Sequence, residues 1–196
     1  MLRRKAYAKK PIFTKEQVYK TAFEVFKIEG IDGISARNLA KSLGASPAPI
    51  YSFYSSIDTL KNELLDEAKK LFLDYVKKER TDSIFLNIGM GICIFAREEK
   101  ELFQAIFLRE SLGKRNEVIR EFRDLIKDEM SKDSRFDNLD EEFKTNLYID
   151  CWMYAHGFAT LIATNYYENI NDEVIKERLM EAAATIVYKR LEDYQK

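Results

Sequence analysis

The sequence predicts an all-α fold, and three observations support this prediction. Only three prolines and seven glycines occur in 196 residues, and two of the prolines, Pro47 and Pro49, stand close together. The long stretches that contain no proline and little glycine are rich in Leu, Glu, Lys, Ala and Phe, which favour helices. A hydrophobic content of 46% is enough to bury a substantial core, so we expect a folded chain.

The charges are distributed unevenly along the chain. Residues 1–60 hold ten Lys or Arg against five Asp or Glu, an excess of five positive charges, while the remaining residues hold 22 against 28. A basic amino-terminal segment on an acidic body is typical of a protein whose first part meets a polyanion. A merely solvated surface would also produce this imbalance, so charge alone does not decide between the two.

Several classes of protein are disfavoured. The basic start is not followed by an apolar run, so no secretory signal is expected and we predict a cytoplasmic protein. The best apolar stretch, 84–96, is shorter than the roughly 20 residues that span a bilayer, so no membrane partner is expected. Cys93 and Cys151 stand alone, which predicts reduced thiols, no metal site and no cofactor.

Residues 1–13 are predicted to form a flexible basic arm, because they lack apolar periodicity before Pro11. The first helix is predicted to begin at Thr14, which has the spacing of a capping box with Gln17. Gly30 is expected to end this helix in the left-handed conformation. The basic side chains of the arm are Arg3, Arg4, Lys5, Lys9 and Lys10.

Two short helices and a longer one are predicted next. Ser35 is the expected N-cap of the second helix and Gly44 its end. Ser46 is the expected cap of the third helix, with Pro47 as its first residue. Ser55 and Asp58 have the spacing that begins a fourth helix over about 56–79. Further helices are expected near 83–97, 100–111, 116–132, 141–166 and 172–193.

A short helix, a tight turn at 44–46 and a second short helix form a helix-turn-helix pattern. Such a unit places its second helix in the DNA major groove. From about Thr14 to Leu65 the chain resembles the TetR family of bacterial transcriptional regulators in the order and spacing of its residues. The segments that carry the resemblance are AFEVFKIEG at 22–30, ISARNLAKSLG at 34–44, and Ser46, Ile50, Tyr51, Phe53, Ser56 and Leu60.

The resemblance implies a DNA-binding domain over 14–60, which contains a three-helix helix-turn-helix. The fourth helix links it to a helical bundle over 61–196 for effector binding and dimerisation. The expected partners are a double-stranded DNA operator, an unknown small-molecule effector and a second copy of the chain. The implied function is repression from a near-palindromic operator, relieved when the effector binds.

The resemblance also implies particular DNA-contacting residues. Ser35 and Arg37 are expected to face phosphate from the second helix, and Tyr51 from the third. Many relatives carry histidine in place of Ser52 and lysine in place of Ile57, so a phosphate contact of the family is missing here. Backbone amides near Ser56 remain available to a phosphate. The residues expected to face the groove are Ser46, Pro47, Ala48, Pro49 and Ser52.

Two sets of residues are candidates for the other roles of the bundle. An apolar effector pocket would be lined by Cys93, Phe103, Phe107, Trp152 and His156. The dimer interface would use Ala155, Ala159, Ala163, Ala182, Ala183 and Ile186 from the last two helices. Each set has an ordinary alternative, since a lone histidine and small helix residues also serve packing within one chain.

Two other functions compete with a DNA-binding regulator. The sequence contains no GxSxG motif, phosphate-binding glycine loop or HExxH motif, so an enzyme has no support. The second competitor is a helical ligand-binding or partner-binding module whose helix-turn-helix has lost specific DNA binding. Ser52 and Ile57 favour that module, whereas the basic amino-terminal segment argues against it.

Overall fold

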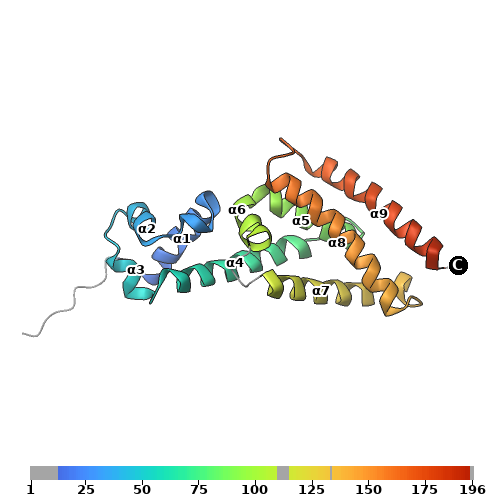
Figure 1. The fold of residues 1–196 in the computed structure, drawn as a ribbon, viewed down its shortest axis with the longest axis horizontal. Coiled ribbons are helices and arrows are strands. Elements are labelled where there is room, and N and C mark those ends of the chain that lie inside the picture. Colours follow the sequence, from blue (N-terminus) through green and yellow to red (C-terminus); the bar gives the residue numbers. More distant parts are fainter. Residues whose placement is uncertain (1–12, 110–114, 133, 195–196) are drawn as a thin grey trace, which may run out of the picture. The chain divides into compact units, whose positions relative to one another are not determined.

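The computed structural model describes residues 13–109, 115–132 and 134–194, and every regular element in these ranges is a helix (Figure 1). The predicted all-α fold is confirmed. None of the described helices is both long and apolar enough to cross a bilayer. Residues 1–12 of the predicted arm lie outside the described part of the chain.

The chain forms two compact units that divide between Leu64 and Leu65. One helix, α4 (Ile57–Lys77), begins in the first unit and ends in the second. The other elements of the first unit are α1 (Lys15–Glu29), the 3-10 turn η1 (Ile31–Gly33), α2 (Ala36–Leu43) and α3 (Ala48–Phe53).

The first helix begins and ends where the sequence predicts. The Thr14 hydroxyl accepts from the Gln17 backbone N–H at 3.1 Å, and the Gln17 side chain accepts from the Thr14 N–H at 2.9 Å. The capping box is therefore confirmed. Gly30 ends the helix, but at φ 71° and ψ −179° rather than in the expected left-handed helical conformation. Glycine alone readily adopts these angles, which lead the chain directly into η1.

The core of the first unit is formed by the inward faces of its helices. Val18 and Phe26 of α1, Leu39 of α2 and Ile50 of α3 are all fully buried. Helix α1 packs against both α2 and α3, so it fixes the position of the two short helices relative to each other.

The helices of the second unit lie near the predicted positions, with one exception. The helix predicted over 100–111 is divided into a short α-helix and a π-helical turn, η2 (Gln104–Leu108). Ala105, Ile106 and Phe107 of that turn are buried in succession, a pattern that α-helical periodicity does not anticipate. The elements are α5 (Ile84–Glu98), α6 (Lys100–Phe103), η2, α7 (Arg115–Ser131), the 3-10 turn η4 (Ser134–Phe136), α8 (Glu141–Ala163) and α9 (Asp172–Tyr194).

The end of α8 also differs from the prediction, because the helix stops at Ala163 instead of continuing to 166. Asn165 adopts a positive φ of 62°, which asparagine tolerates better than most residues. The Tyr166 N–H then returns to the Leu161 carbonyl at 2.9 Å, so the end of the helix is satisfied by its own backbone.

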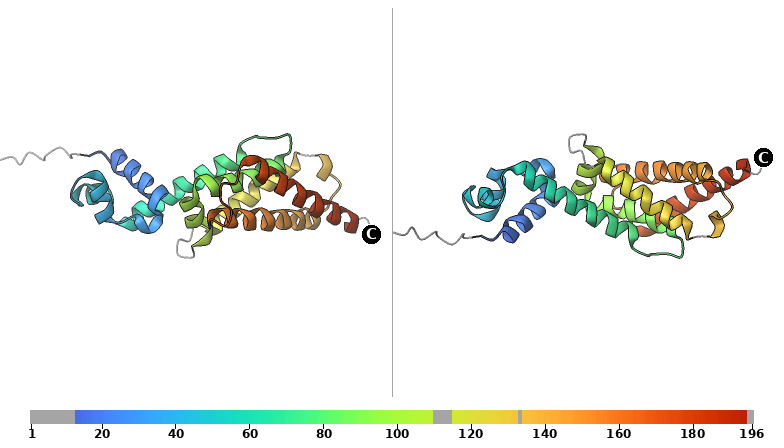
Figure 2. Two further views of the ribbon diagram at one scale, coloured as in Figure 1. Left: turned by 90° about the horizontal axis from the view of Figure 1, so that it is seen from above. Right: turned by 90° about the horizontal axis from the view of Figure 1, so that it is seen from below.

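Helix α5 is the centre of the second unit and is buried continuously from Asn87 to Ala96. It packs against both α8 and α9, which also pack against each other (Figure 2). Its approach to α4 is very close at Gly91, where a Cβ would lie 2.4 Å from the Tyr75 carbonyl oxygen and 2.7 Å from the Val76 Cα. Only glycine fits at this crossing.

The connection from α4 to α5 is held by one buried amide. The Asn87 side-chain oxygen accepts from the backbone N–H groups of Arg80 at 3.1 Å and Thr81 at 2.7 Å. The Arg80 guanidinium donates to the Tyr75 carbonyl at 2.8 Å, near the end of α4. The end of α4 is thus fixed to α5 by hydrogen bonds as well as by packing.

Candidate functional site

The pair of short helices in the first unit forms a helix-turn-helix. The Ser35 hydroxyl caps α2 by accepting from the Asn38 backbone N–H at 3.2 Å. Gly44 closes α2 in the left-handed conformation, at φ 62° and ψ 34°. The Ala45 N–H returns to the Ala40 carbonyl at 2.9 Å, which tightens the turn toward α3. The predicted start and end of α2 are confirmed.

The predicted start of α3 is wrong by one residue. Pro47 is the N-cap instead of the first helical residue, and no side chain, that of Ser46 included, bonds the first turn. Pro47 supplies its carbonyl, which accepts from Ile50 N–H at 3.1 Å. Pro49 then falls among the first helical positions, where a missing N–H removes no helical bond.

The start of α4 also requires a correction. Ser56, and not Ser55, caps the helix, because its hydroxyl accepts from the Thr59 backbone N–H at 3.1 Å. The hydroxyl of Ser55 lies 3.2 Å from that of Thr59 instead. The amides of Ile57 and Asp58 have no partner within the helix by its geometry, so they remain available to a phosphate.

Most of the residues predicted to contact DNA are exposed. Ser35, Pro49 and Ser56 are partly buried, whereas the others are open to solvent. The Ser52 hydroxyl donates to the Pro49 carbonyl at 2.6 Å, so it is left to act as an acceptor. The exposed members are Arg37, Ser46, Pro47, Ala48, Tyr51 and Ser52.

Two side chains on this surface can bind phosphate directly. The Tyr51 side chain is 55% exposed. Within the described residues, neither the Arg37 guanidinium nor the Tyr51 hydroxyl has a hydrogen bond or ion pair. A free guanidinium and a free phenol are groups that commonly donate to phosphate oxygens.

Tyr54 at the end of α3 packs against a polar cluster formed by Lys15 of α1 and Glu63 of α4. Tyr54 is buried, and its hydroxyl lacks a well-formed hydrogen bond among the described residues. Burial and the neighbouring Glu63 carboxylate raise the pKa of Tyr54 to about 12, so it is neutral at physiological pH. Lys15 lies 4.9 Å from the centre of the Tyr54 ring and pairs with Glu63 at 3.2 Å. These contacts join α1, α3 and the start of α4.

The positive charge of the first unit has a specific location. Residues 14–60 contain five Lys or Arg and five Asp or Glu, which balance. The whole excess of residues 1–60 therefore comes from the basic side chains between Arg3 and Lys10, outside the described residues. Residues 14–60, which contain the helix-turn-helix, therefore carry no net formal charge.

In the second unit, the residues predicted for an effector pocket are brought together but pack on one another. The His156 ring lies 5.7 Å from Phe103, 5.4 Å from Phe107 and 5.0 Å from Trp152, measured between ring centres. Cys93 is fully buried beside α8. A small cavity of about 30 Å³ reaches this cluster at Trp152.

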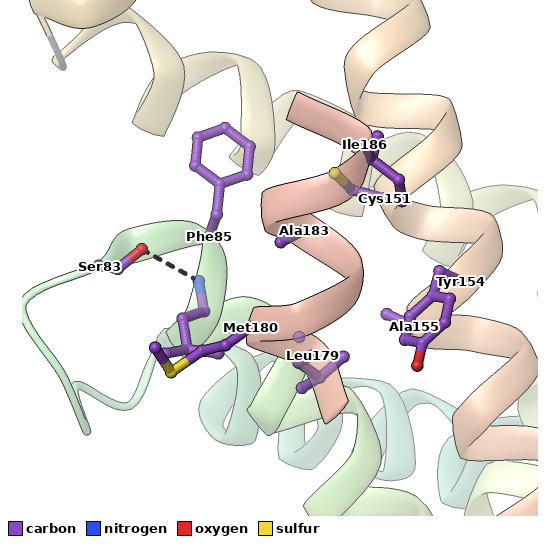
Figure 3. A pocket seen from close by; sticks show the side chains of 11 residues that line it. Ser83, Phe85, Cys151, Tyr154, Ala155, Leu179, Met180, Ala183 and Ile186 are labelled. Carbon is purple, nitrogen blue, oxygen red and sulfur yellow. Dashed lines mark hydrogen bonds between the residues drawn. The ribbon is translucent and has the colours of Figure 1, made fainter. Parts of the chain in front are cut away.

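The apolar cavity lies beside that cluster, among α5, α8 and α9 (Figure 3). Its volume is about 240 Å³. The sequence did not predict this cavity, because its lining comes together only when three separate helices pack. Its lining includes Gly89 from α5, Cys151 and Ala155 from α8, and Leu179, Ala183 and Ile186 from α9.

The alanines predicted for a dimer interface are divided between the interior and the surface. Ala155, Ala159 and Ala163 are 5%, 0% and 0% exposed, so they pack within the chain. Ala182, Ala183 and Ile186 are partly buried. The exposed apolar face of α8 lies elsewhere and is formed by Ile149, Met153, Gly157 and Leu161.

Comparisons with known proteins support this architecture. No family model matches the chain. The HTH-type transcriptional regulator YobS of Bacillus subtilis, itself described as uncharacterized, is 26% identical over 165 residues, covering 81% of this chain and 84% of the relative. A solved structure of a TetR family protein from Vibrio parahaemolyticus matches with a TM-score of 0.59 and 16% identity, covering 87% of this chain and 96% of that chain.

The fold is therefore that of the TetR family, and the resemblance carried by the amino-terminal sequence is confirmed. Over most of its length the chain is also similar in sequence to a protein described as an HTH-type transcriptional regulator.

Proposed function

We propose that this chain is a cytoplasmic, homodimeric repressor that binds a near-palindromic DNA operator and is released by a small-molecule effector. The observation that carries DNA binding is the helix-turn-helix of α2 and α3, on which Arg37 and Tyr51 are exposed and unpaired within the described residues. Two recognition helices one turn of DNA apart read a palindrome, so the proposal requires a dimer.

The expected readout follows from the residues at the start of α3. Ala48 and Pro49 have no side-chain hydrogen-bonding groups, so they suit contact with thymine methyl groups. Arg37 and Tyr51 then position the helix through phosphates without reading sequence. We therefore expect an operator that depends on thymines and DNA shape, and a selected binding site with invariant guanines under α3 would contradict this readout.

A module that has lost DNA binding is the second candidate, and the balanced charge of residues 14–60 favours it. Binding of the full chain to double-stranded DNA from around its own gene, followed by fluorescence anisotropy in a salt series, separates the two. We expect two subunits to bind tightly and in a salt-dependent way. The affinity for DNA should fall at least about tenfold in Arg37→Ala, because hydrogen bonds to charged groups contribute about 1.5–3 kcal/mol each. Weak binding that ignores both sequence and Arg37 would favour the module.

Two tyrosines at the end of α3 provide a matched control for this experiment. Tyr51→Phe removes an exposed hydroxyl and should weaken binding to every DNA sequence to a similar extent, as loss of a phosphate contact does. Tyr54→Phe removes a buried hydroxyl that lacks a well-formed bond, so DNA affinity should be unchanged and stability equal or slightly higher. A loss confined to one base pair in Tyr51→Phe would instead assign that hydroxyl to base readout.

The exposed apolar face of α8, together with α9, is the proposed dimer interface. Met153 is 59% exposed and Leu161 40%, one turn to either side of Gly157. A Cβ at Gly157 would meet nothing within 4 Å in the protomer, so packing within the chain does not require glycine there. A close approach of a second helix would explain it, because glycine in a helix interior costs about 1 kcal/mol relative to alanine.

Replacing Met153 with Glu is expected to convert the dimer to a monomer, because two-fold symmetry would bury two like charges together. Light scattering coupled to gel filtration measures the change as a halved molar mass. Ile28→Glu is the matched control, since Ile28 is an exposed apolar residue of α1, 76% exposed and outside the proposed interface. A dimer that persists in Met153→Glu would exclude this face.

Effector release follows from linkage between the two binding sites. If the effector weakens operator binding, the operator weakens effector binding by the same factor, commonly about 1–3 kcal/mol. Helix α4 belongs to both units, so it is the covalent route by which a change in the second unit reaches the first.

A further inference from the structure

The cavity among α5, α8 and α9 is a void left by small residues. Ala155 of α8 and Ala183 of α9 line it (Figure 3). Gly89 of α5 lines it as well, and none of these three small residues fills the space between the helices. Leu179 approaches Gly89 most closely, at 3.3 Å from the position of a Cβ. Unfilled apolar volume lowers stability, so an occupant of matching shape would be bound favourably.

The chemistry of the lining excludes a charged occupant. Its residues include no Lys, Arg, Asp, Glu or His. Two of its three polar side chains are already engaged, since Ser83 accepts from the Leu86 N–H at 3.4 Å and Tyr154 donates to the Arg178 carbonyl at 3.3 Å. The third is Cys151, and burial followed by the nearby Asp150 carboxylate raises the pKa of its thiol to about 11, so it is neutral. A charge placed here would be buried without a partner.

The volume sets the size of the occupant. An apolar cavity of about 150 Å³ holds benzene, and sites for drug-sized ligands begin at about 300 Å³. This cavity, at about 240 Å³, falls between these limits. A smaller void of about 30 Å³ shares Phe85, Gly89, Cys151 and Ala155 with it and extends toward Trp152. The combined space suits one or two rings with a short substituent.

Two other cavities of the second unit have a different character. The groove between α7 and α8, about 160 Å³, is lined by Arg123, Lys127 and Lys144 among others. The wide hollow at the end of α8 is lined by Arg97, Lys100 and Glu168. Their charged linings favour water, whereas the α5–α8–α9 cavity has no charged residue in its lining and is mostly apolar.

We propose that the α5–α8–α9 cavity is the effector site and that its ligand is a neutral, largely apolar molecule of one or two rings. This inference rests on the proposed function, which requires an effector, and adds the location and the chemical class. Cys151 stands where the larger and smaller voids meet, so its side chain controls how much space the ligand has.

Calorimetry with naphthalene and 2-naphthoate tests the ligand class on the full chain. We expect naphthalene to bind, and the carboxylate of the same shape to bind on the order of 100-fold more weakly because its charge would be buried unpaired. Cys151→Phe should fill the junction and weaken naphthalene binding at least about tenfold, whereas Cys151→Ser should leave it nearly unchanged. Equal binding of the two probes, or no naphthalene binding, would overturn the proposal.

A second measurement locates the probe without any substitution. Nuclear Overhauser effects from naphthalene protons to the methyl groups of Leu179 and Met180 are expected, since both residues line the cavity. Effects confined to methyl groups outside the lining would overturn the assignment even if naphthalene binds.

Operator binding is measured separately, so that a failure of the proposed regulator function can be distinguished from a failure of the proposed effector site. Saturating naphthalene should lower operator affinity about 5–150-fold, the usual range of allosteric coupling. Tight operator binding that naphthalene leaves unchanged would overturn the effector assignment while the regulator function stands. If no DNA is bound at all, the proposed function fails, and the calorimetry alone supports or overturns the ligand class.

Discussion

A chain that lacks residues 1–10 is expected to bind DNA more weakly and with much less dependence on salt. The five basic side chains of that segment supply the whole excess charge of residues 1–60, and residues 14–60 are balanced. Each phosphate contact contributes about 0.9 to the slope of log affinity against log salt concentration. If half of the ten basic side chains in a dimer contact phosphate, the slope changes by about 4.5, or roughly 500-fold in affinity between 50 and 200 mM salt.

The control for this truncation keeps the length and removes the charge. A chain in which Arg3, Arg4, Lys5, Lys9 and Lys10 are all replaced by Gln should behave like the truncated chain if charge is the cause. Anisotropy titrations over a salt series give the slopes. If truncated and full-length chains have the same slope, the segment makes no phosphate contact and the folded helices alone account for binding.

Replacing Gly91 with Ala is expected to destabilise the second unit by about 3 kcal/mol, since overpacking a close backbone contact costs this order of energy. The added Cβ would lie 2.4 Å from the Tyr75 carbonyl oxygen and 2.7 Å from the Val76 Cα, which are backbone atoms of α4. Backbone atoms cannot rotate away as a side chain does, so the two helices must separate. The midpoint of thermal unfolding should fall by roughly 6–12 °C.

Gly89→Ala is the matched control, because Gly89 is buried in the same helix two residues earlier. Its new Cβ would meet only side-chain carbons of Leu179, at 3.3 Å and 3.4 Å, and these can shift by a few tenths of an ångström. The gain in helix propensity, about 1 kcal/mol, offsets the crowding, so little change is expected. Both variants are compared at one protein concentration, and equal midpoints would mean that α4 and α5 separate easily.

The local rules of the sequence predicted some details of the helix-turn-helix and failed on others for a physical reason. The Thr14 capping box and the end of α2 at Gly44 each depend on residues within one turn, and both are confirmed, whereas the left-handed conformation predicted for Gly30 is not. The caps of α3 and α4 fall where two adjacent residues compete, Ser46 with Pro47 and Ser55 with Ser56. Ser55 and Ser56 have the same local preference, and at α3 Pro47 takes the N-cap although Ser46 is the stronger capping residue, so the packing of Ile50 and Leu60 into the core decides where each helix begins.

The sites of the second unit depend on contacts between distant segments, which a single sequence does not specify. The stripe of Ala155, Ala159 and Ala163 was visible as a small face, but nothing in its spacing tells whether that face meets the same chain or a second copy. The aromatic residues near His156 were expected to surround a space and instead fill it. The actual cavity appears only when Gly89, Ala155 and Ala183 come together from three helices.

The two glycines of α5 lie on two different faces of this helix, one packed tightly against α4 and the other bordering the cavity. Gly89 and Gly91 are two residues apart, which places them about 200° apart around the helix. At Gly91 the backbones of α5 and α4 touch with no side chain between them, while at Gly89 the helix borders the cavity. An occupant that widens the cavity therefore presses α5 against a surface that cannot be compressed. We therefore expect a displacement of α5 away from the cavity to move α4 as well, because backbone atoms in contact cannot rotate out of the way as side chains do.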